Sequence, residues 1–149
     1  MSVQAQDSRI PIDTTIVTTN EVSVNGQKIT YKATTGMQPV WDDHGEVIAS
    51  LYFTYYQRTN VKNREKRPII MSFNGGPGSA SVWMHIAYTG PKVLNIDEEG
   101  YPIQPYGVKD NPNSIIDVAD IVYINPVNTG YSRPVVKEGE KLDKSLFFG

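Results

Sequence analysis

The pattern of hydrophobic and polar positions predicts antiparallel strands in the first sixty residues. Strand-like stretches at 15–24 and 27–32 flank Asn25-Gly26, a dipeptide that tolerates the positive φ angles of a type I′ turn. After a polar turn at 42–45, residues 46–56 alternate. We expect one face of this strand to be buried. The predicted buried face carries Val47, Ala49, Leu51, Phe53 and Tyr55, and the more polar face Ile48, Ser50, Tyr52, Thr54 and Tyr56.

The pattern changes after residue 67. The apolar run 68–73 predicts a strand buried on both faces, as in parallel sheets. Apolar spacings of three and four predict a helix over 79–88 that ends at Gly90-Pro91. A hairpin over 93–104, a helical turn at 115–119 and a buried strand at 120–125 follow. Strand, loop, helix and strand form a βαβ unit, so the fold class is α/β, with an antiparallel meander leading into a parallel pair.

Charged segments in this half are expected to be solvated. We interpret the basic stretch 60–67 as an exposed loop rather than a nucleic-acid groove, because no aromatic residues interleave. The acidic turn 97–100 lacks the ligand spacing of a calcium loop. Capping and solvation explain Asp117 and Asp120 better than paired acid–base work does.

Composition narrows the function classes further. The 149 residues contain 14 basic and 16 acidic side chains, which gives no electrostatic footprint for nucleic acid. The absence of cysteine excludes disulfides, thiolate zinc sites and a cysteine nucleophile. No apolar run reaches the roughly 18 residues of a membrane span. His44 is expected to be exposed and His85 to be a surface or boundary residue, and neither has metal-ligand spacing, so we expect no metal and no cofactor.

A glycine-rich loop, Asn74-Gly75-Gly76-Pro77-Gly78, joins the strand at 68–73 to the helix. Backbone N–H groups at such a position can hold a phosphate or the oxyanion of a tetrahedral intermediate. Phosphate is disfavoured, because neither the P-loop lysine nor the third glycine of a dinucleotide fingerprint is present. Spacing alone leaves two alternatives, a substrate-facing loop and a tight βα turn without a ligand.

The residues from Phe73 to Ser81 resemble the Asn-Gly-Gly-Pro-Gly signature of the serine carboxypeptidases, an α/β-hydrolase family of exopeptidases. The resemblance covers roughly residues 45 to 149. It continues in order through the segments Gly90-Pro91-Lys92, Asn111-Pro112-Asn113-Ser114 and Pro126-Val127-Asn128-Thr129-Gly130-Tyr131-Ser132. Ser79 stands where the family often has cysteine, which is similar to the family's bacterial branch.

The resemblance implies a role for three residues of the loop. Gly76 would supply a backbone N–H of the oxyanion hole, and Asn74 with the Gly75 amide would bind the free C-terminal carboxylate of a peptide substrate. Three positions depart from the family pattern. These are Ser72, where an aromatic residue is frequent, Asn125, where Asp is usual, and Asn128, where Gly is usual.

The chain has no Gly-x-Ser-x-Gly nucleophile elbow. The nearest string, Gly130 to Pro134, ends in proline, so we interpret Ser132 as a loop residue. We therefore expect residues 1–14 to be a flexible N-terminus and residues 15–149 to be the N-terminal portion of an incomplete serine carboxypeptidase domain. Alone it would be inactive, with the remainder of the catalytic domain as its partner. The alternatives are a non-catalytic peptide- or partner-binding module and an acyltransferase relative of the same fold.

The two ends of the sequence support further expectations. The polar residues around Val3-Gln4-Ala5-Gln6 are either a disordered terminus or the neighbourhood of a former signal cleavage site, and the second interpretation favours a periplasmic or secreted protein. The apolar end at 146–149 looks interrupted rather than finished.

Overall fold

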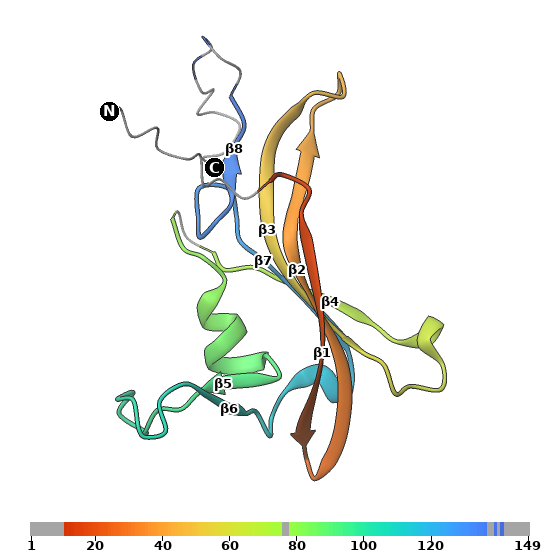
Figure 1. Ribbon diagram of the computed structural model, residues 1–149, viewed down its shortest axis with the longest axis vertical. Coiled ribbons are helices and arrows are strands. Elements are labelled where there is room, and N and C mark those ends of the chain that lie inside the picture. The colour runs from red at the N-terminus through yellow and green to blue at the C-terminus, as the bar shows by residue number, and fades with distance from the viewer. Residues whose placement is uncertain (1–10, 76–77, 137–138, 140, 142–149) are drawn as a thin grey trace, which may run out of the picture.

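The computed structural model describes residues 11–75, 78–136, 139 and 141, and its main feature is a mixed six-stranded sheet (Figure 1). The strand order is β1-β2-β3-β7-β4, and β8 pairs with β3. The strands of this sheet are β1 (Thr15–Val24), β2 (Gln27–Trp41), β3 (Val47–Arg58), β4 (Ile69–Ser72), β7 (Asp120–Ile124) and β8 (Arg133–Pro134). Strands dominate the described residues, and helix is scarce, which fits part of an α/β fold.

The predicted meander is confirmed. β1 and β2 pair antiparallel across a turn in which Asn25 has a φ of 49° and Gly26 a φ of 75°. These positive angles suit Asn and Gly better than other residues, so the local sequence determines the turn. β3 in turn pairs antiparallel with β2, with a register shift between Val40 and Trp41.

The parallel unit is confirmed as well. β4 pairs parallel with β7, with Ile69 opposite Asp120 and Ser72 opposite Tyr123. β7 also pairs antiparallel with β3, so it joins the parallel strand to the meander. The carboxyl ends of β4 and β7 therefore lie side by side at one end of the strands, and their amino ends lie together at the other end.

The predicted helix is present but shorter and wider than expected. Val82 and Trp83 are helical and lead into a π-helix, η2 (Met84–Thr89). The Gly90 N–H donates to the His85 carbonyl at 3.1 Å, a bond with the five-residue spacing of a π turn. A Cβ at Gly90 would lie 2.1 Å from that oxygen, so only glycine fits where the helix ends.

The segments that follow η2 form hydrogen bonds with its C-terminal end. The hairpin of β5 (Lys92–Leu94) and β6 (Val108–Asp110) reaches further along the chain than the predicted 93–104. Immediately after β6, the Asn111 side chain donates to the carbonyls of Tyr88 and Gly90, both at 2.8 Å. Ser114 caps the short helix η3 (Ile115–Asp117) and donates to the Thr89 carbonyl at 3.1 Å. The Gly90 and Asn111 segments thus meet at one helix end.

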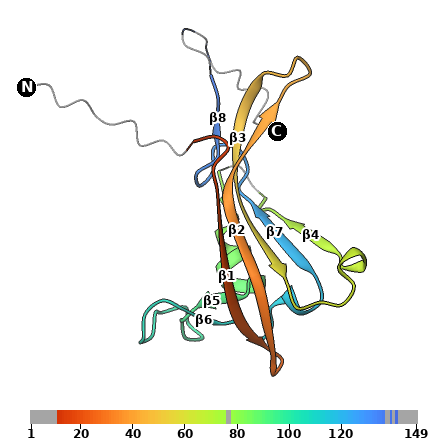
Figure 2. The same ribbon diagram turned by 45° about the vertical axis from the view of Figure 1, so that its right-hand side comes forward.

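The core lies on the face of β3 that was expected to be polar. Its buried residues are Val22, Val24, Ile29, Tyr31 and Ile116, with Ala33 and Tyr56 packed against them. Tyr56 lies opposite Ala33 on β2 and Ile121 on β7, and opposite residues share a face. Figures 1 and 2 show η2 on this same side of the sheet. The prediction that the Val47–Tyr55 face holds the main core is wrong, although Ala49 on that face is fully buried. The hydroxyls of the other face are accommodated because they hydrogen-bond one another and His85.

The expected burial of β4 is also wrong. The side chains of Ile69, Met71 and Phe73 are 58%, 68% and 66% exposed. β4 is an edge strand that pairs only with β7 in the sheet, and no element among the described residues covers this face. An exposed apolar edge strand of this kind marks an interaction or aggregation-prone surface.

Candidate functional site

The glycine-rich loop begins at Asn74, two residues beyond the carboxyl end of β4, and one buried hydroxyl fixes its backbone. Ser81 is 2% exposed. Its Oγ accepts the Asn74 N–H at 3.1 Å and donates to the carbonyl of Ile124, the last residue of β7. A single side chain therefore ties the start of the loop to the end of the neighbouring parallel strand.

Asn125 completes this connection from β7. Its Oδ1 accepts the Ser81 N–H at 3.0 Å, close to the start of the helix. A carboxylate oxygen could accept the same hydrogen bond, which explains why Asn can stand where the family usually has Asp. Ser132 is fully buried, where it accepts the Tyr52 N–H at 2.7 Å and donates to the Asn125 carbonyl at 2.7 Å. Both functions of its hydroxyl are used, in agreement with the interpretation of Ser132 as a loop residue.

Among the residues predicted to form the site, Asn74 and Gly75 are adjacent at the loop's start. The Asn74 side chain is half-buried, and its Nδ2 donates to the Ser79 hydroxyl, while Gly75 is exposed. Gly76 lies outside the described residues. Further along, Asn128, which stands where the family usually has Gly, has a φ of 66°, a left-handed conformation that Asn tolerates better than other non-glycine residues.

A cavity of about 230 Å³ lies between residues 80–82, η2, the strands β3 and β7 and the turn at 130–131, and sequence reasoning missed it. Its lining includes Tyr52, Ser81, His85, Tyr123, Asn125 and Tyr131. A second cavity of about 250 Å³ shares Tyr52, Thr54 and His85 with the first. The available signal was the row of hydroxyl-bearing residues on β3, which we assigned to the polar face.

His85 lines both cavities and is mostly buried. Its Nε2 lies 2.6 Å from the Tyr56 hydroxyl, and its ring stacks on Tyr123 with centroids 4.5 Å apart. Burial lowers the pKa of His85 from 6.5 to about 4, and burial raises the pKa of Tyr123 to about 12. His85 is therefore neutral at pH 7 and fits the boundary position predicted for it. His44 is exposed, as predicted.

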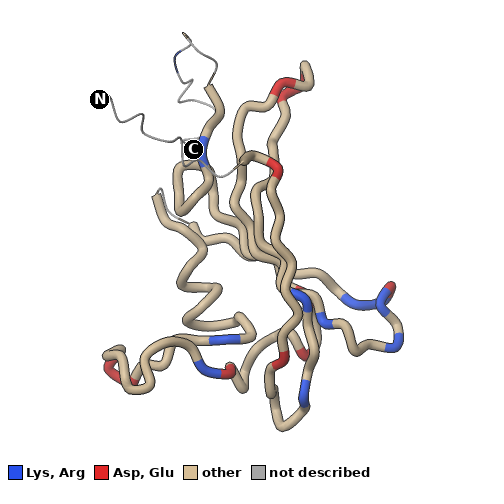
Figure 3. Tube along the Cα trace, viewed as in Figure 1, with Lys and Arg blue, Asp and Glu red and all other residues tan. Residues whose placement is uncertain are grey.

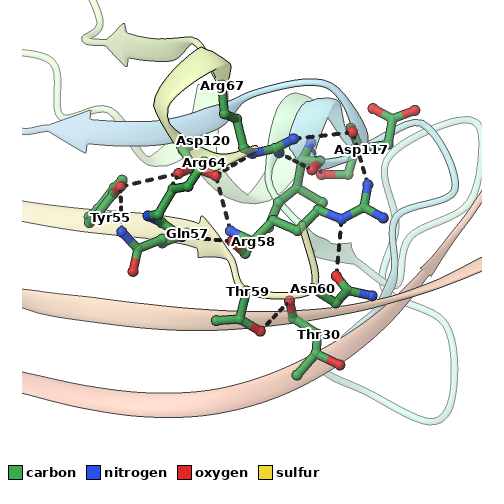
Figure 4. A network of polar contacts seen from close by, with 12 residues as sticks. Thr30, Tyr55, Gln57, Arg58, Thr59, Asn60, Arg64, Arg67, Asp117 and Asp120 are labelled. Carbon is green, nitrogen blue, oxygen red and sulfur yellow. Dashed lines mark hydrogen bonds and ion pairs between the residues drawn. The ribbon is translucent and has the colours of Figure 1, made fainter. Parts of the chain in front are cut away.

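A cluster of charged residues lies at the opposite end of the parallel pair β4–β7. Figure 3 shows Lys and Arg gathered on the loop between β3 and β4, which includes η1 (Arg64–Lys66). Figure 4 shows that two of these arginines turn inward to Asp120, the first residue of β7. Arg67 Nε donates to one Asp120 carboxylate oxygen at 2.6 Å, and Arg64 Nη2 donates to the other at 3.1 Å.

This arrangement corrects two predictions. The Asp120 side chain is 3% exposed and that of Arg67 is 8% exposed, so neither is solvated. Asp120 also accepts the Arg58 N–H at 3.0 Å. The Asp117 carbonyl accepts hydrogen bonds from Arg58 and Arg67. The solvated-loop interpretation of 60–67 fails for Arg67, because its partner lies more than fifty residues away in sequence. Arg64 also pairs with Asp120, but its side chain stays 44% exposed, as that interpretation expects.

Two negative findings apply to the described part of the chain. None of its helices is long and apolar enough to cross a membrane. In the same residues, no cluster of three or more His, Cys, Asp or Glu side chains has an arrangement that could hold a metal ion.

Comparison with known proteins identifies the family. Carboxypeptidase Y of Schizosaccharomyces pombe is 31% identical over 104 residues, which are 69% of this chain and 9% of that protein. The pheromone-processing carboxypeptidase KEX1 of Saccharomyces cerevisiae is 30% identical over 107 residues, 71% of this chain and 14% of that protein. Serine carboxypeptidase S10 family member 1 of Dictyostelium discoideum is 28% identical over 92 residues, 61% of this chain and 20% of that protein. The chain thus matches only a small part of each relative. The family profile of the serine carboxypeptidases matches residues 25–146, and the chain belongs to that family.

Proposed function

We propose that this chain supplies the oxyanion-hole and carboxylate-binding loop of a serine-type carboxypeptidase with an α/β-hydrolase fold. The observation that carries the proposal is the position of Asn74 and Gly75. They follow the carboxyl end of a parallel strand, where open α/β sheets bind ligands, and Ser81 holds the Asn74 backbone in place. Membership of the serine carboxypeptidase family supports a peptidase activity for the enzyme that contains this loop.

In the proposed mechanism the loop contributes neutral donors. The Asn74 carboxamide and the Gly75 N–H bind the C-terminal carboxylate of a peptide, so the bond before the last residue is presented for cleavage. The Gly76 N–H stabilises the oxyanion that forms when a serine attacks that carbonyl, and one such donor lowers the barrier by about 3 kcal/mol. An acyl-enzyme then forms and water hydrolyses it. This chemistry needs no cofactor.

We propose that the attacking serine is not among these 149 residues. The sequence has no Gly-x-Ser-x-Gly, and the Ser132 hydroxyl is fully occupied within its turn. The exposed apolar side chains of β4 support the same conclusion, since they form a surface against which further chain can pack. We therefore propose that the remainder of the catalytic domain provides the serine, acid and histidine, and that this chain alone is inactive.

The experiment measures hydrolysis of an N-blocked dipeptide with a free C-terminal carboxylate and of the same dipeptide as its C-terminal amide. The complete gene product should prefer the free carboxylate, and Asn74→Ala should reduce kcat/KM for that substrate by about tenfold or more, because a hydrogen bond to a charged group contributes about 1.5–3 kcal/mol. The amide should be affected far less.

Four other outcomes would each contradict a part of the proposal. Equal losses on both substrates would contradict the carboxylate role of Asn74. Turnover by the isolated 149-residue chain would contradict its inactivity. Transfer of the acyl group to an added alcohol in place of hydrolysis would identify an acyltransferase, and binding of the peptide without any turnover would identify a non-catalytic module.

A further inference from the structure

We propose that the Ser79 hydroxyl is a second side-chain donor to the C-terminal carboxylate of the substrate, acting beside Asn74. This inference rests on the proposed function and names a binding residue that the family signature does not supply, since cysteine is frequent at this position. The observation behind it is the hydrogen bond from Asn74 Nδ2 to Ser79 Oγ, which places the two polar groups next to each other on the loop.

The number of available protons favours joint binding. The Asn74 carboxamide nitrogen carries two protons, of which one is directed to Ser79 Oγ. The other remains available to a ligand. Ser79 uses an oxygen lone pair in this contact, so its own O–H proton is retained, and the structure gives that proton no acceptor among the described residues. Two protons on neighbouring atoms match the two oxygens of one carboxylate.

The second serine of the loop shows why Ser79 is the one available to a substrate. Ser81 is buried, and its hydroxyl both accepts the Asn74 N–H and donates to the Ile124 carbonyl. Ser79 is half-buried, and its hydroxyl contacts the Asn74 side chain rather than the buried end of β7. The two serines therefore divide the work, with Ser81 fixing the backbone of Asn74 and Ser79 facing the ligand.

Charge strengthens the inference. The sequence contains no Lys or Arg between Arg67 and Lys92, and both Arg64 and Arg67 are engaged with Asp120 at the other end of the parallel pair β4–β7. No cation on this loop is available to neutralise a bound carboxylate. The donors that the loop itself offers to an anion are neutral, and an additional hydroxyl increases their number.

The test uses the complete gene product with the paired free-carboxylate and amide dipeptides. Ser79→Cys is close in size and replaces the hydroxyl by a weak donor, and it creates no disulfide because the chain has no other cysteine. Ser79→Cys and Ser79→Ala should each raise KM for the free carboxylate by about tenfold, with kcat nearly unchanged. Ser79→Thr, which keeps a hydroxyl, should restore most of the affinity. The amide substrate should show no change in KM.

The outcomes separate this inference from the proposed function. If Asn74→Ala impairs free-carboxylate hydrolysis while Ser79→Ala and Ser79→Cys do not, the Ser79 role is wrong and the proposed function stands. If neither Asn74→Ala nor the Ser79 variants alter the preference for a free carboxylate, both are wrong. Equal losses on both substrates, with Ser79→Thr as impaired as Ser79→Ala, would reduce Ser79 to a structural residue. Thermal melts of each variant establish that the proteins compared are folded.

Discussion

The two ends of the parallel pair β4–β7 are held by opposite kinds of chemistry. At the amino end, the buried Asp120 carboxylate accepts hydrogen bonds from two arginine side chains, a backbone N–H and a tyrosine hydroxyl. At the carboxyl end, Ser81 and Asn125 join the strands through neutral hydrogen bonds alone. Both ends connect the same strands, yet only one of them contains formal charges.

The two ends of β4–β7 differ in whether their polar groups are used within the fold or remain available to a ligand. At the charged end the polar groups hydrogen-bond to one another. Among the described residues, no buried side-chain polar atom lacks a partner. The neutral end instead leaves Gly75 exposed and Asn74 and Ser79 half-buried, with protons available to a ligand. We infer that the amino end maintains the sheet and that the carboxyl end is where a substrate is recognised.

Removing the charge at the amino end should produce the largest effect. Asp120→Asn leaves the buried Arg67 guanidinium without its counter-charge and should lower the free energy of unfolding by about 3–5 kcal/mol. Urea unfolding of the variant measures this. Asp43→Asn, at an exposed position in the 42–45 turn, is the matched control and should change little. A loss below about 1 kcal/mol for Asp120→Asn would mean that the two ends do not differ as described.

Lowering the pH should destabilise the folded protein through His85, which lies on η2, the helix that follows the glycine-rich loop. The pKa of His85 is about 4 in the folded protein and 6.5 when unfolded. Between these values only the unfolded state takes up the proton, so stability falls as pH drops from 6.5 to 4, by up to about 3 kcal/mol, and this group has no further effect below pH 4. His85→Gln should flatten the dependence measured by urea unfolding across that range. An unchanged profile would contradict the burial of a neutral His85.

Loss of the Ser81 hydroxyl should have a smaller effect on stability. Ser81→Ala deprives the Asn74 N–H and the Ile124 carbonyl of their partner, which should cost about 1–3 kcal/mol. Hydrogen exchange of the Asn74 amide should accelerate relative to amides within β3. If exchange at Asn74 stays the same, Ser81 does not hold the loop.

The smallest effect is expected at the surface. Lys28 and Glu21 form an ion pair at 2.7 Å with side chains that are 72% and 53% exposed. Solvent screens such pairs, so Glu21→Gln should alter the free energy of unfolding by no more than about 1 kcal/mol. An effect as large as that of Asp120→Asn would show that burial is not what distinguishes the charged end.

Sequence patterns predicted the features that depend on neighbours in the chain. The Asn25-Gly26 turn, the parallel pairing of the strands around the glycine-rich loop and the helix end at Gly90 follow from local chemistry. The partner of Arg67 could not be predicted in this way, because Asp120 is brought to it only by the pairing of β4 with β7. The core face of β3 was missed because Tyr56 and Thr54 count as polar until their buried partners are known.

The candidate site also contains residues that the sequence could indicate and residues that only the structure revealed. The family resemblance directed attention to Asn74 and Gly75, whereas Ser81 and Asn125 emerged as their supports only from the contacts between the ends of β4 and β7. The contact between Ser81 and Asn125 joins residues more than forty positions apart, so no local motif contains both.

The most direct measurement is a crystal structure of the complete gene product with a cleaved amino acid, a product that retains the C-terminal carboxylate. The account predicts carboxylate oxygens within about 3 Å of Asn74 Nδ2 and the Gly75 nitrogen. A product carboxylate bound at another place, with the loop at Asn74 empty, would contradict the assignment of substrate recognition to the neutral end of the sheet.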